Sequence, residues 1–195
     1  MKEYIIKKYS GSFESTEKAF IGEYPWGDKY CPEAYFKAVH TDNEFIIQLT
    51  CKESSPKAVH RGYMSPVYKD SCLEFFACYG KGGYINCEVN SVGASLIAYG
   101  ADRHCRTPLL DLCGTLPEIK AEKTDDFWRV TITMPYEIIK KVYGITDIPS
   151  GYEFYGNAYK CGDDCDIPHY GMWNGATCEK PDFHRPEFFG KFIVE

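Results

Sequence analysis

Glu74 is the residue of this sequence whose setting most strongly suggests chemistry. If residues 72–77 form a strand, Leu73 and Phe75 point to one face. Cys72, Glu74 and Phe76 then point to the other face, which would otherwise be apolar. An isolated buried charge costs several kcal/mol, so Glu74 needs a partner, an opening to water or a ligand. The segment alone favours a structural ion pair or hydrogen bond as much as a ligand role.

Aromatic and polar residues elsewhere in the chain are suited to binding a sugar. A sugar presents an apolar C–H face and a rim of hydroxyls, so its site needs aromatic plates and hydrogen-bonding groups at the edge. We expect Tyr68 and Trp173 to be the plates, with Tyr170 close to Trp173 in the same loop. The expected edge groups are Glu74, Asn90, Asn157 and Lys160.

A paired-carboxylate enzyme is a second hypothesis. Glu74 and Glu88 occupy neighbouring strands of an expected hairpin, and two close carboxylates would raise the pKa of one of them. The register is open, because a slip of one residue puts the two on opposite faces. The sequence has no nucleophile elbow, Walker loop, dinucleotide fingerprint or His-Glu-x-x-His run. A Cys/His pair cannot be localised from the sequence.

Cysteine and histidine are concentrated near the C-terminus in a pattern that includes zinc-ligand types. Cys161, Cys165, His169 and Cys178 are spaced four, four and nine residues apart. There is no tight Cys-x-x-Cys pair and the order matches no common zinc module, so a polar, thiol-rich loop is favoured over a metal site. The chain has ten cysteines, and several lie inside expected strands, where we expect reduced thiols in the core.

Length and charge limit the possible classes of protein. The 195 residues suit one domain, 1–195, with a substantial core. The net charge of −6 and the pI of about 5.4 argue against a general nucleic-acid or membrane-surface binder. No apolar run approaches the length of a membrane span. Residues 1–8 lack the apolar core of a signal peptide, so we expect a cytoplasmic location.

The elements that must position these residues are mostly strands. Period-two patterns predict strands at 35–40, 45–51, 72–79, 84–89, 94–99, 127–134, 152–160 and 188–194. One helix is predicted between Pro135, at a first-turn position, and Gly144, which can end it. This composition predicts an all-β fold, an antiparallel β-sandwich of jelly-roll type with one short helix. Two long loops, 52–69 and 161–186, are expected to serve function.

Several motifs in order along the chain resemble one known family. They are YKDSCLEFF at 68–76, YINCEVNSVG at 84–93, FWRVTI at 127–132 with Met134-Pro135, NAYK at 157–160, HYGMW at 169–173 and FHRPEFFG at 183–190. The first two are similar to the central strands of family 9 carbohydrate-binding modules, and the last three to the C-terminal signature of that family. The resemblance spans about residues 15–195.

The resemblance implies a β-sandwich that binds the ends of sugar chains between two aromatic side chains. On this chain the plates would be Tyr68, where well-studied members carry tryptophan, and Trp173, with Glu74 bonding sugar hydroxyls. Tyrosine offers a smaller stacking face than tryptophan. Members of the family often bind structural calcium, so the resemblance leaves a structural calcium ion open, with ligands that the sequence does not identify. We expect no other cofactor.

The leading hypothesis is therefore non-catalytic binding of a mono- or oligosaccharide, with no nucleic-acid or membrane partner. The alternatives are a glycoside hydrolase-type enzyme and a structural or protein-interaction sandwich in which Glu74 is merely paired.

Overall fold

The computed structural model describes residues 1–27 and 29–195, and thirteen strands form in this part of the chain. The first seven are β1 (Glu3–Lys8), β2 (Ala19–Phe20), β3 (Ala34–His40), β4 (Glu44–Cys51), β5 (Cys72–Cys78), β6 (Tyr84–Asn90) and β7 (Ser95–Gly100). The others are β8 (Arg106–Pro108), β9 (Glu118–Lys123), β10 (Trp128–Pro135), β11 (Glu153–Gly162), β12 (His169–Met172) and β13 (Gly190–Val194). No described helix is long and apolar enough to cross a membrane.

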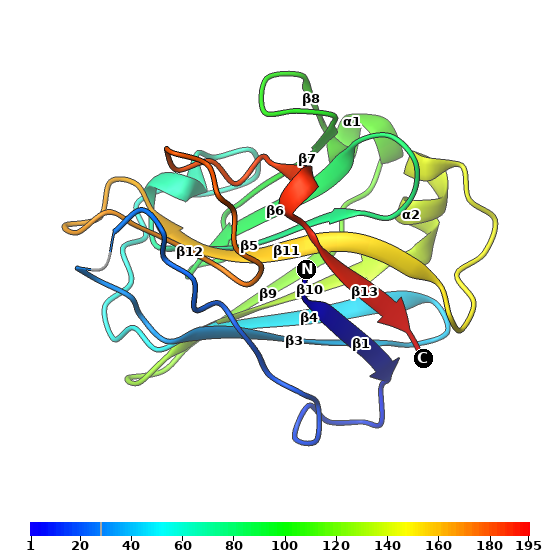
Figure 1. Cartoon of the computed structure of the whole chain (residues 1–195), viewed down its shortest axis with the longest axis horizontal. Helices are drawn as coiled ribbons and strands as arrows, with labels where there is room; N and C mark the ends of the chain where they lie inside the picture. Colours follow the sequence, from blue (N-terminus) through cyan, green and yellow to red (C-terminus); the bar gives the residue numbers. More distant parts are fainter. Residues whose placement is uncertain (28) are drawn as a thin grey trace.

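The strands form one curled sheet whose two halves face each other as the layers of a sandwich (Figure 1). The order is β8-β7-β6-β5-β11-β13-β1-β3-β4-β10-β9, with β12 added to β11 and β2 added to β3. The predicted β-sandwich is confirmed. One feature differs from a purely antiparallel sheet, because β1 pairs in parallel with both β13 and β3 and so joins the two layers.

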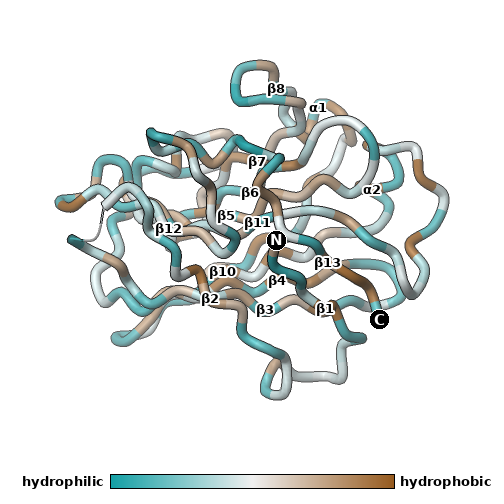
Figure 2. The backbone as a smooth tube through the Cα atoms, viewed as in Figure 1, coloured by the Kyte–Doolittle hydropathy of each residue, from teal (hydrophilic) through white to brown (hydrophobic). Residues whose placement is uncertain are grey.

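The layers enclose a core that the alternation of the strands predicts. Phe36 of one layer lies 6.3 Å from Phe75 of the other and 5.8 Å from Phe192, measured between ring centroids. Figure 2 shows hydrophobic stretches along the strands and mainly hydrophilic loops at the edges. Each fully buried aromatic or aliphatic side chain contributes about 1.5–3 kcal/mol, so this interior is the main source of stability.

The predicted helix is confirmed as α2 (Tyr136–Tyr143), which Pro135 precedes. Gly144 ends it in the left-handed conformation, with φ of 65°. A second helix, α1 (Leu109–Cys113), was not predicted, because five residues carry too little periodicity to signal a helix. Two short 3₁₀ turns are also present, at Val67–Lys69 and Pro186–Phe188.

All eight predicted strands are present, with ends that differ by a few residues. The β5–β6 hairpin forms as expected, and its residues alternate between two environments. Leu73 and Phe75 face the core between the layers, while Cys72 and Phe76 belong to a second apolar cluster on the outer face of the sheet. Glu74 shares this outer face, so its side chain lies outside the main core.

Candidate functional site

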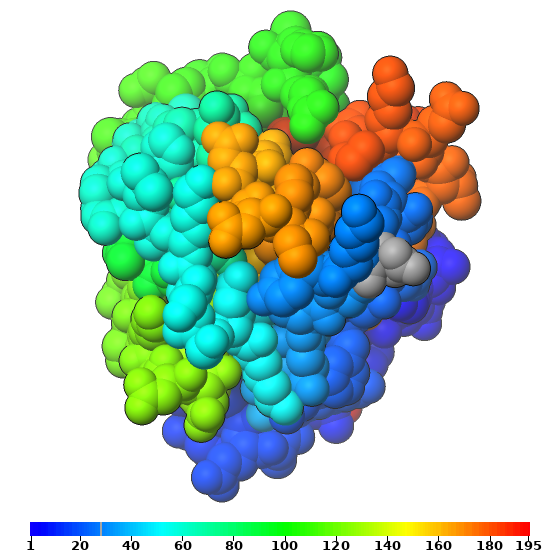
Figure 3. Space-filling model, turned by 90° about the vertical axis from the view of Figure 1, so that its left-hand side faces the viewer, coloured from blue at the N-terminus to red at the C-terminus, as the bar shows by residue number. Residues whose placement is uncertain are grey.

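A cavity of about 750 Å³ lies over the outer face of β5 and β6. Its lining combines carboxyl groups, basic groups and aromatic rings, among them Tyr68, Glu74, Glu88, Asp163, Tyr170 and Phe183. Both long loops contribute to it. Figure 3 shows the segment after β11, in orange, beside the segment before β5, in cyan. Two backbone hydrogen bonds join them, from Asp163 N to Tyr68 O at 3.0 Å and from Asp164 N to Lys69 O at 3.2 Å.

Two carboxyl groups on adjacent strands lie in the floor of the cavity. Glu74 is directly opposite Glu88, so the register brings the two to one face. Burial, followed by the Cys161 thiol and Glu88, raises the pKa of Glu74 well above its ordinary value. Burial raises the pKa of Glu88 to about 7, against the opposing effects of the Asn86 hydrogen bond and Arg106. Both groups therefore favour their neutral forms more than exposed carboxyls do.

One carboxyl oxygen of Glu88 accepts a hydrogen bond within the protein, and the other is available to a ligand. The Asn86 amide donates a hydrogen bond of 2.8 Å to Glu88 Oε1. Glu88 Oε2 is buried and has no hydrogen-bond partner among the described residues. A buried polar atom without a partner costs about 1–3 kcal/mol, which a donor group on a ligand would recover.

Arg106 supports this floor from β8. Its guanidinium donates to Asn86 Oδ1 from Nε at 2.9 Å and from Nη2 at 2.5 Å, and it lies 4.3 Å from the centre of the Tyr84 ring. Asn86 in turn donates to Glu88, so Arg106 orients that carboxyl through the amide. Sequence reasoning missed Arg106 and Asn86, since nothing local links β8 to β6.

Aromatic residues contribute to the lining of the cavity. Tyr68 and Tyr170 both line it and are half-buried. The Tyr170 ring lies 6.2 Å from Phe183 and 6.4 Å from Trp26, both in edge-to-face geometry, and these contacts hold it in place. The prediction placed Tyr68, Glu74 and Tyr170 near one another, and the structure brings all three to this cavity.

Trp173 does not lie in the cavity, contrary to the expectation that it faces Tyr68. It is 4% exposed, and its ring packs between the layers, 5.3 Å from Phe36 and 5.1 Å from Phe192. A side chain at Gly190 would meet it, because a Cβ there would come within 2.4 Å of Trp173 Cζ3. With its faces covered by protein, Trp173 cannot stack on a sugar.

Asn157 and Asn90 are also absent from the cavity lining, because their amides hold loops in place. Asn157 is 1% exposed, donates to Asn174 O at 2.8 Å and accepts from Asn174 N at 2.9 Å. Asn90 is fully buried, donates to Asp70 Oδ2 at 2.9 Å and accepts from Ala94 N at 3.0 Å. Neither amide is free to bond a sugar edge in this arrangement.

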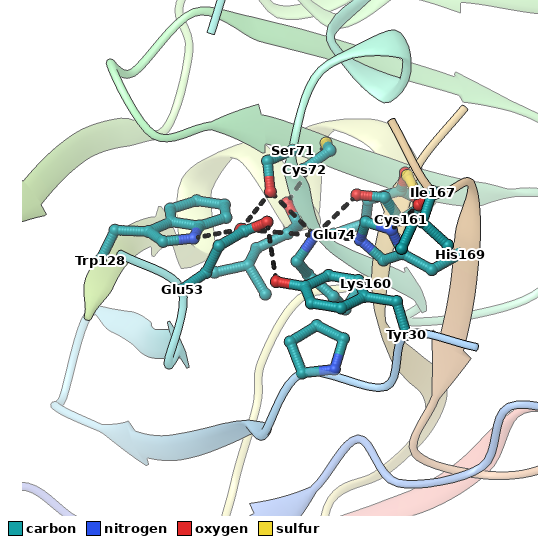
Figure 4. A network of polar contacts seen from close by, with 12 residues as sticks. Tyr30, Glu53, Ser71, Cys72, Glu74, Trp128, Lys160, Cys161, Ile167 and His169 are labelled. Carbon is teal, nitrogen blue, oxygen red and sulfur yellow. Dashed lines mark hydrogen bonds and ion pairs between the residues drawn. The ribbon is translucent and has the colours of Figure 1, made fainter. Parts of the chain in front are cut away.

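Lys160 is directly opposite Leu73, a core residue of β5, so its side chain points to the face of β11 away from the cavity floor. Figure 4 shows it within a polar network that includes Glu53, Ser71 and His169. Its Nζ donates to Ser71 Oγ and to Cys161 O, each at 2.9 Å, and contacts His169 Nε2 at 2.5 Å. Glu53 Oε2 completes the group at 3.7 Å and also accepts a bond from Ser71. Lys160 is fully buried, so it is a structural cation and not an edge group of the cavity.

The charge of Lys160 lowers the pKa values of both Glu53 and His169. Burial raises the pKa of Glu53, but Lys160 and the hydrogen bonds from Ser71 and Trp128 outweigh it, so the net pKa lies below the ordinary value. Burial and the nearby Lys160 charge lower the pKa of His169 to about 4. A smaller cavity of about 400 Å³ borders the network beside Tyr30, Glu53 and His169.

The four potential zinc ligands near the C-terminus, Cys161, Cys165, His169 and Cys178, do not form a common ligand group in the structure. Both His169 nitrogens are engaged, Nδ1 with Ile167 O at 2.9 Å and Nε2 with Lys160. Among the described residues one group of three ligand types does converge, and it consists of Cys72, Glu74 and Cys161. All ten cysteines are free thiols in the described structure. Two sulfurs and one carboxylate do not fit calcium, which takes six to eight oxygen ligands.

Comparison with known proteins agrees with the fold. A comparison with curated protein sequences found no significant match. A crystal structure of a candidate carbohydrate-binding protein from Bacteroides uniformis ATCC 8492 has a TM-score of 0.82 and 26% identity, covering 100% of this chain and 99% of that one.

Two further structures come from a family 9 carbohydrate-binding module of Caldicellulosiruptor kristjanssonii, each 12% identical and covering 100% of this chain. The complex with cellotriose has a TM-score of 0.68 and is covered over 94% of its length, and the complex with glucose has 0.71 and 96%. The sequence profile of carbohydrate-binding family 9 matches residues 12–194, nearly the whole chain. The chain therefore belongs to carbohydrate-binding family 9.

Proposed function

We propose that this protein binds a mono- or oligosaccharide, through a chain end, in the cavity over β5 and β6, without catalysing a reaction. Tyr68 and Tyr170 provide the aromatic surfaces, and Glu74 and Glu88 provide the hydrogen-bonding floor. The observation that carries the proposal is the buried Glu88 Oε2, which lacks a partner among the described residues, in a cavity that two half-buried tyrosine residues also line.

The chemistry of the floor suits hydroxyl groups. A neutral carboxyl group donates one hydrogen bond and accepts others, so Glu74 can satisfy a hydroxyl in either sense. Glu88, with a pKa of about 7, exchanges between the two forms near neutrality and accepts in both. The cavity volume of about 750 Å³ lies within the range of small-molecule sites.

The placement of the two carboxyls favours binding over hydrolysis. Residues directly opposite on antiparallel strands have Cβ atoms about 4.5–5.5 Å apart and point the same way from the sheet. Glycoside hydrolysis requires two carboxyls that flank the scissile bond, so that each reaches a different atom of it. Glu74 and Glu88 rise from one floor and would contact one side of a bound sugar.

Titration calorimetry with glucose, cellotriose and a broad glycan panel tests the proposal. We expect one class of sugar to bind with a micromolar or weaker Kd, and Glu88→Ala to weaken it at least tenfold. Glu153→Ala, at an exposed carboxylate on β11, is the matched control and should keep wild-type affinity.

Two results would overturn the proposal. No binding to any glycan would favour the structural or interaction sandwich. Release of product from aryl glycosides or oligosaccharides, lost in Glu88→Ala, would identify an enzyme.

A further inference from the structure

Two thiols and a carboxyl converge beneath the sugar cavity. Cys72 of β5 is directly opposite Cys161 of β11, and Glu74 follows Cys72 by two residues on the same face. The two Sγ atoms and a Glu74 oxygen all lie within 4.8 Å of one another. The Cys161 thiol donates to Glu74 Oε1 at 3.0 Å. All three side chains are almost completely buried.

Charged groups of both signs surround this cluster, since Arg103 and Arg106 line the same cavity and act to lower the pKa of Glu88. Glu88 and Asp163 line the same cavity as Glu74 and Cys161. No basic side chain among the described residues is within ion-pair distance of Glu74 or Glu88. Lys160, the nearest lysine along β11, donates its hydrogen bonds on the other face. A bound cation would offset the charge that these groups acquire when they ionise.

The donor set selects the kind of cation. Thiolates with a carboxylate are ligands of zinc and other thiophilic metals. In a tetrahedral zinc site two sulfurs at about 2.3 Å from the metal are about 3.8 Å apart. The observed limit of 4.8 Å therefore leaves only small rotamer changes between the free and the metal-bound arrangement. Cys161 and Glu74 also line the cavity, so a fourth ligand can enter from that side.

We propose that Cys72, Cys161 and Glu74 bind a thiophilic divalent cation of the zinc class, with the fourth coordination position open to the cavity. The proposal does not depend on sugar binding. Metal binding displaces the protons of both thiols, because the thiolate is the ligand, and it therefore strengthens as the pH rises.

Cobalt is a visible probe of this site. The reduced full-length protein is titrated with Co²⁺ in the absence of sugar, and then with Zn²⁺. We expect one equivalent of Co²⁺ to give a sulfur-to-cobalt charge-transfer band, which one equivalent of Zn²⁺ abolishes. Cys72→Ser and Cys161→Ser should each weaken binding at least tenfold and reduce the band. Glu74→Gln should weaken binding but keep both thiolate contributions to the band of the bound ion.

Cys78 is the matched control. It lies on the same strand and the same face as Cys72, but its thiol donates to Gly80 O at 3.0 Å, away from the cluster. Cys78→Ser should therefore bind Co²⁺ like the wild type. A wild-type protein without the band, or a band unchanged in both Cys72→Ser and Cys161→Ser, would overturn the proposal.

X-ray absorption of the zinc-loaded wild type keeps the test independent of variant folding. We expect about two sulfur ligands near 2.3 Å and lighter ligands near 2.0 Å. A shell with no sulfur, or one of three or four sulfurs, would refute the assignment. Sugar titrations run with a chelator test the proposed function separately, so failure of either idea leaves the other standing.

Discussion

Glu74 of β5 lies directly opposite Glu88 of β6, and both carboxyls are buried on the outer face of the sheet. Alternation along each strand puts them on one face only because the hairpin has this register. The pairing gives the cavity a floor of two groups with raised pKa values. We therefore expect both the stability of the fold and the proposed sugar binding to depend on pH.

The first prediction concerns stability and pH at Glu88. Its folded-state pKa of about 7 lies above the ordinary 4.5, so the neutral form stabilises the fold. That contribution is complete below about pH 4.5 and is lost as the pH rises through about 7, up to about 3 kcal/mol. The unfolding free energy of Glu88→Gln should therefore rise relative to that of the wild type as the pH is raised from about pH 5 to about pH 8. Urea denaturation at both pH values measures this, and a constant difference would contradict it.

The second prediction concerns Trp173. Because its ring fills the space between Phe36 and Phe192, Trp173→Ala should lower the unfolding free energy by roughly 3–5 kcal/mol. The affinity of the folded fraction for sugar should stay near that of the wild type. Urea denaturation and calorimetry check the two parts. If Trp173→Ala kept wild-type stability but lost sugar binding, Trp173 would have to be a binding residue.

The third prediction concerns Tyr68 and Tyr170, the two tyrosines that line the cavity. Tyr68→Ala and Tyr170→Ala should each weaken sugar binding about tenfold, since one aromatic contact contributes about 0.5–1.5 kcal/mol beyond area burial. Tyr155, an exposed tyrosine on β11 outside the cavity, is the matched control. Calorimetry on the three variants should separate Tyr155→Ala from the other two. Equal affinity in all three would move the site elsewhere.

The fourth prediction concerns the buried pair of Lys160 and Glu53. Lys160→Met leaves the Glu53 carboxylate without its cation and should cost roughly 3–5 kcal/mol of unfolding free energy. Adding Glu53→Gln should recover much of this loss. The exposed pair of Lys8 and Asp42 is the control, and its disruption should cost much less, because water screens the two charges. A double-mutant cycle by urea denaturation measures both, and additive effects at Lys160 and Glu53 would contradict the coupling.

Local patterns in the sequence determined most of the fold. Alternation predicted the eight main strands and placed Leu73 and Phe75 in the core, and Pro135 and Gly144 marked the ends of α2. The same alternation showed that the outer face of β5 carries a carboxyl among apolar neighbours. These features depend on near neighbours along the chain, and a single sequence contains that information.

Only the tertiary structure decided which side chains meet. Trp173 looked like a binding residue, yet strand pairing turns it toward Phe36. Lys160 could have faced the cavity, but its ammonium group compensates the negative charge of Glu53, which is more than one hundred positions away in the sequence. The pairs of Glu74 with Glu88 and of Cys72 with Cys161 depend on the register between strands. Register and loop direction are set by the burial of the whole sheet, so composition and spacing alone cannot specify them.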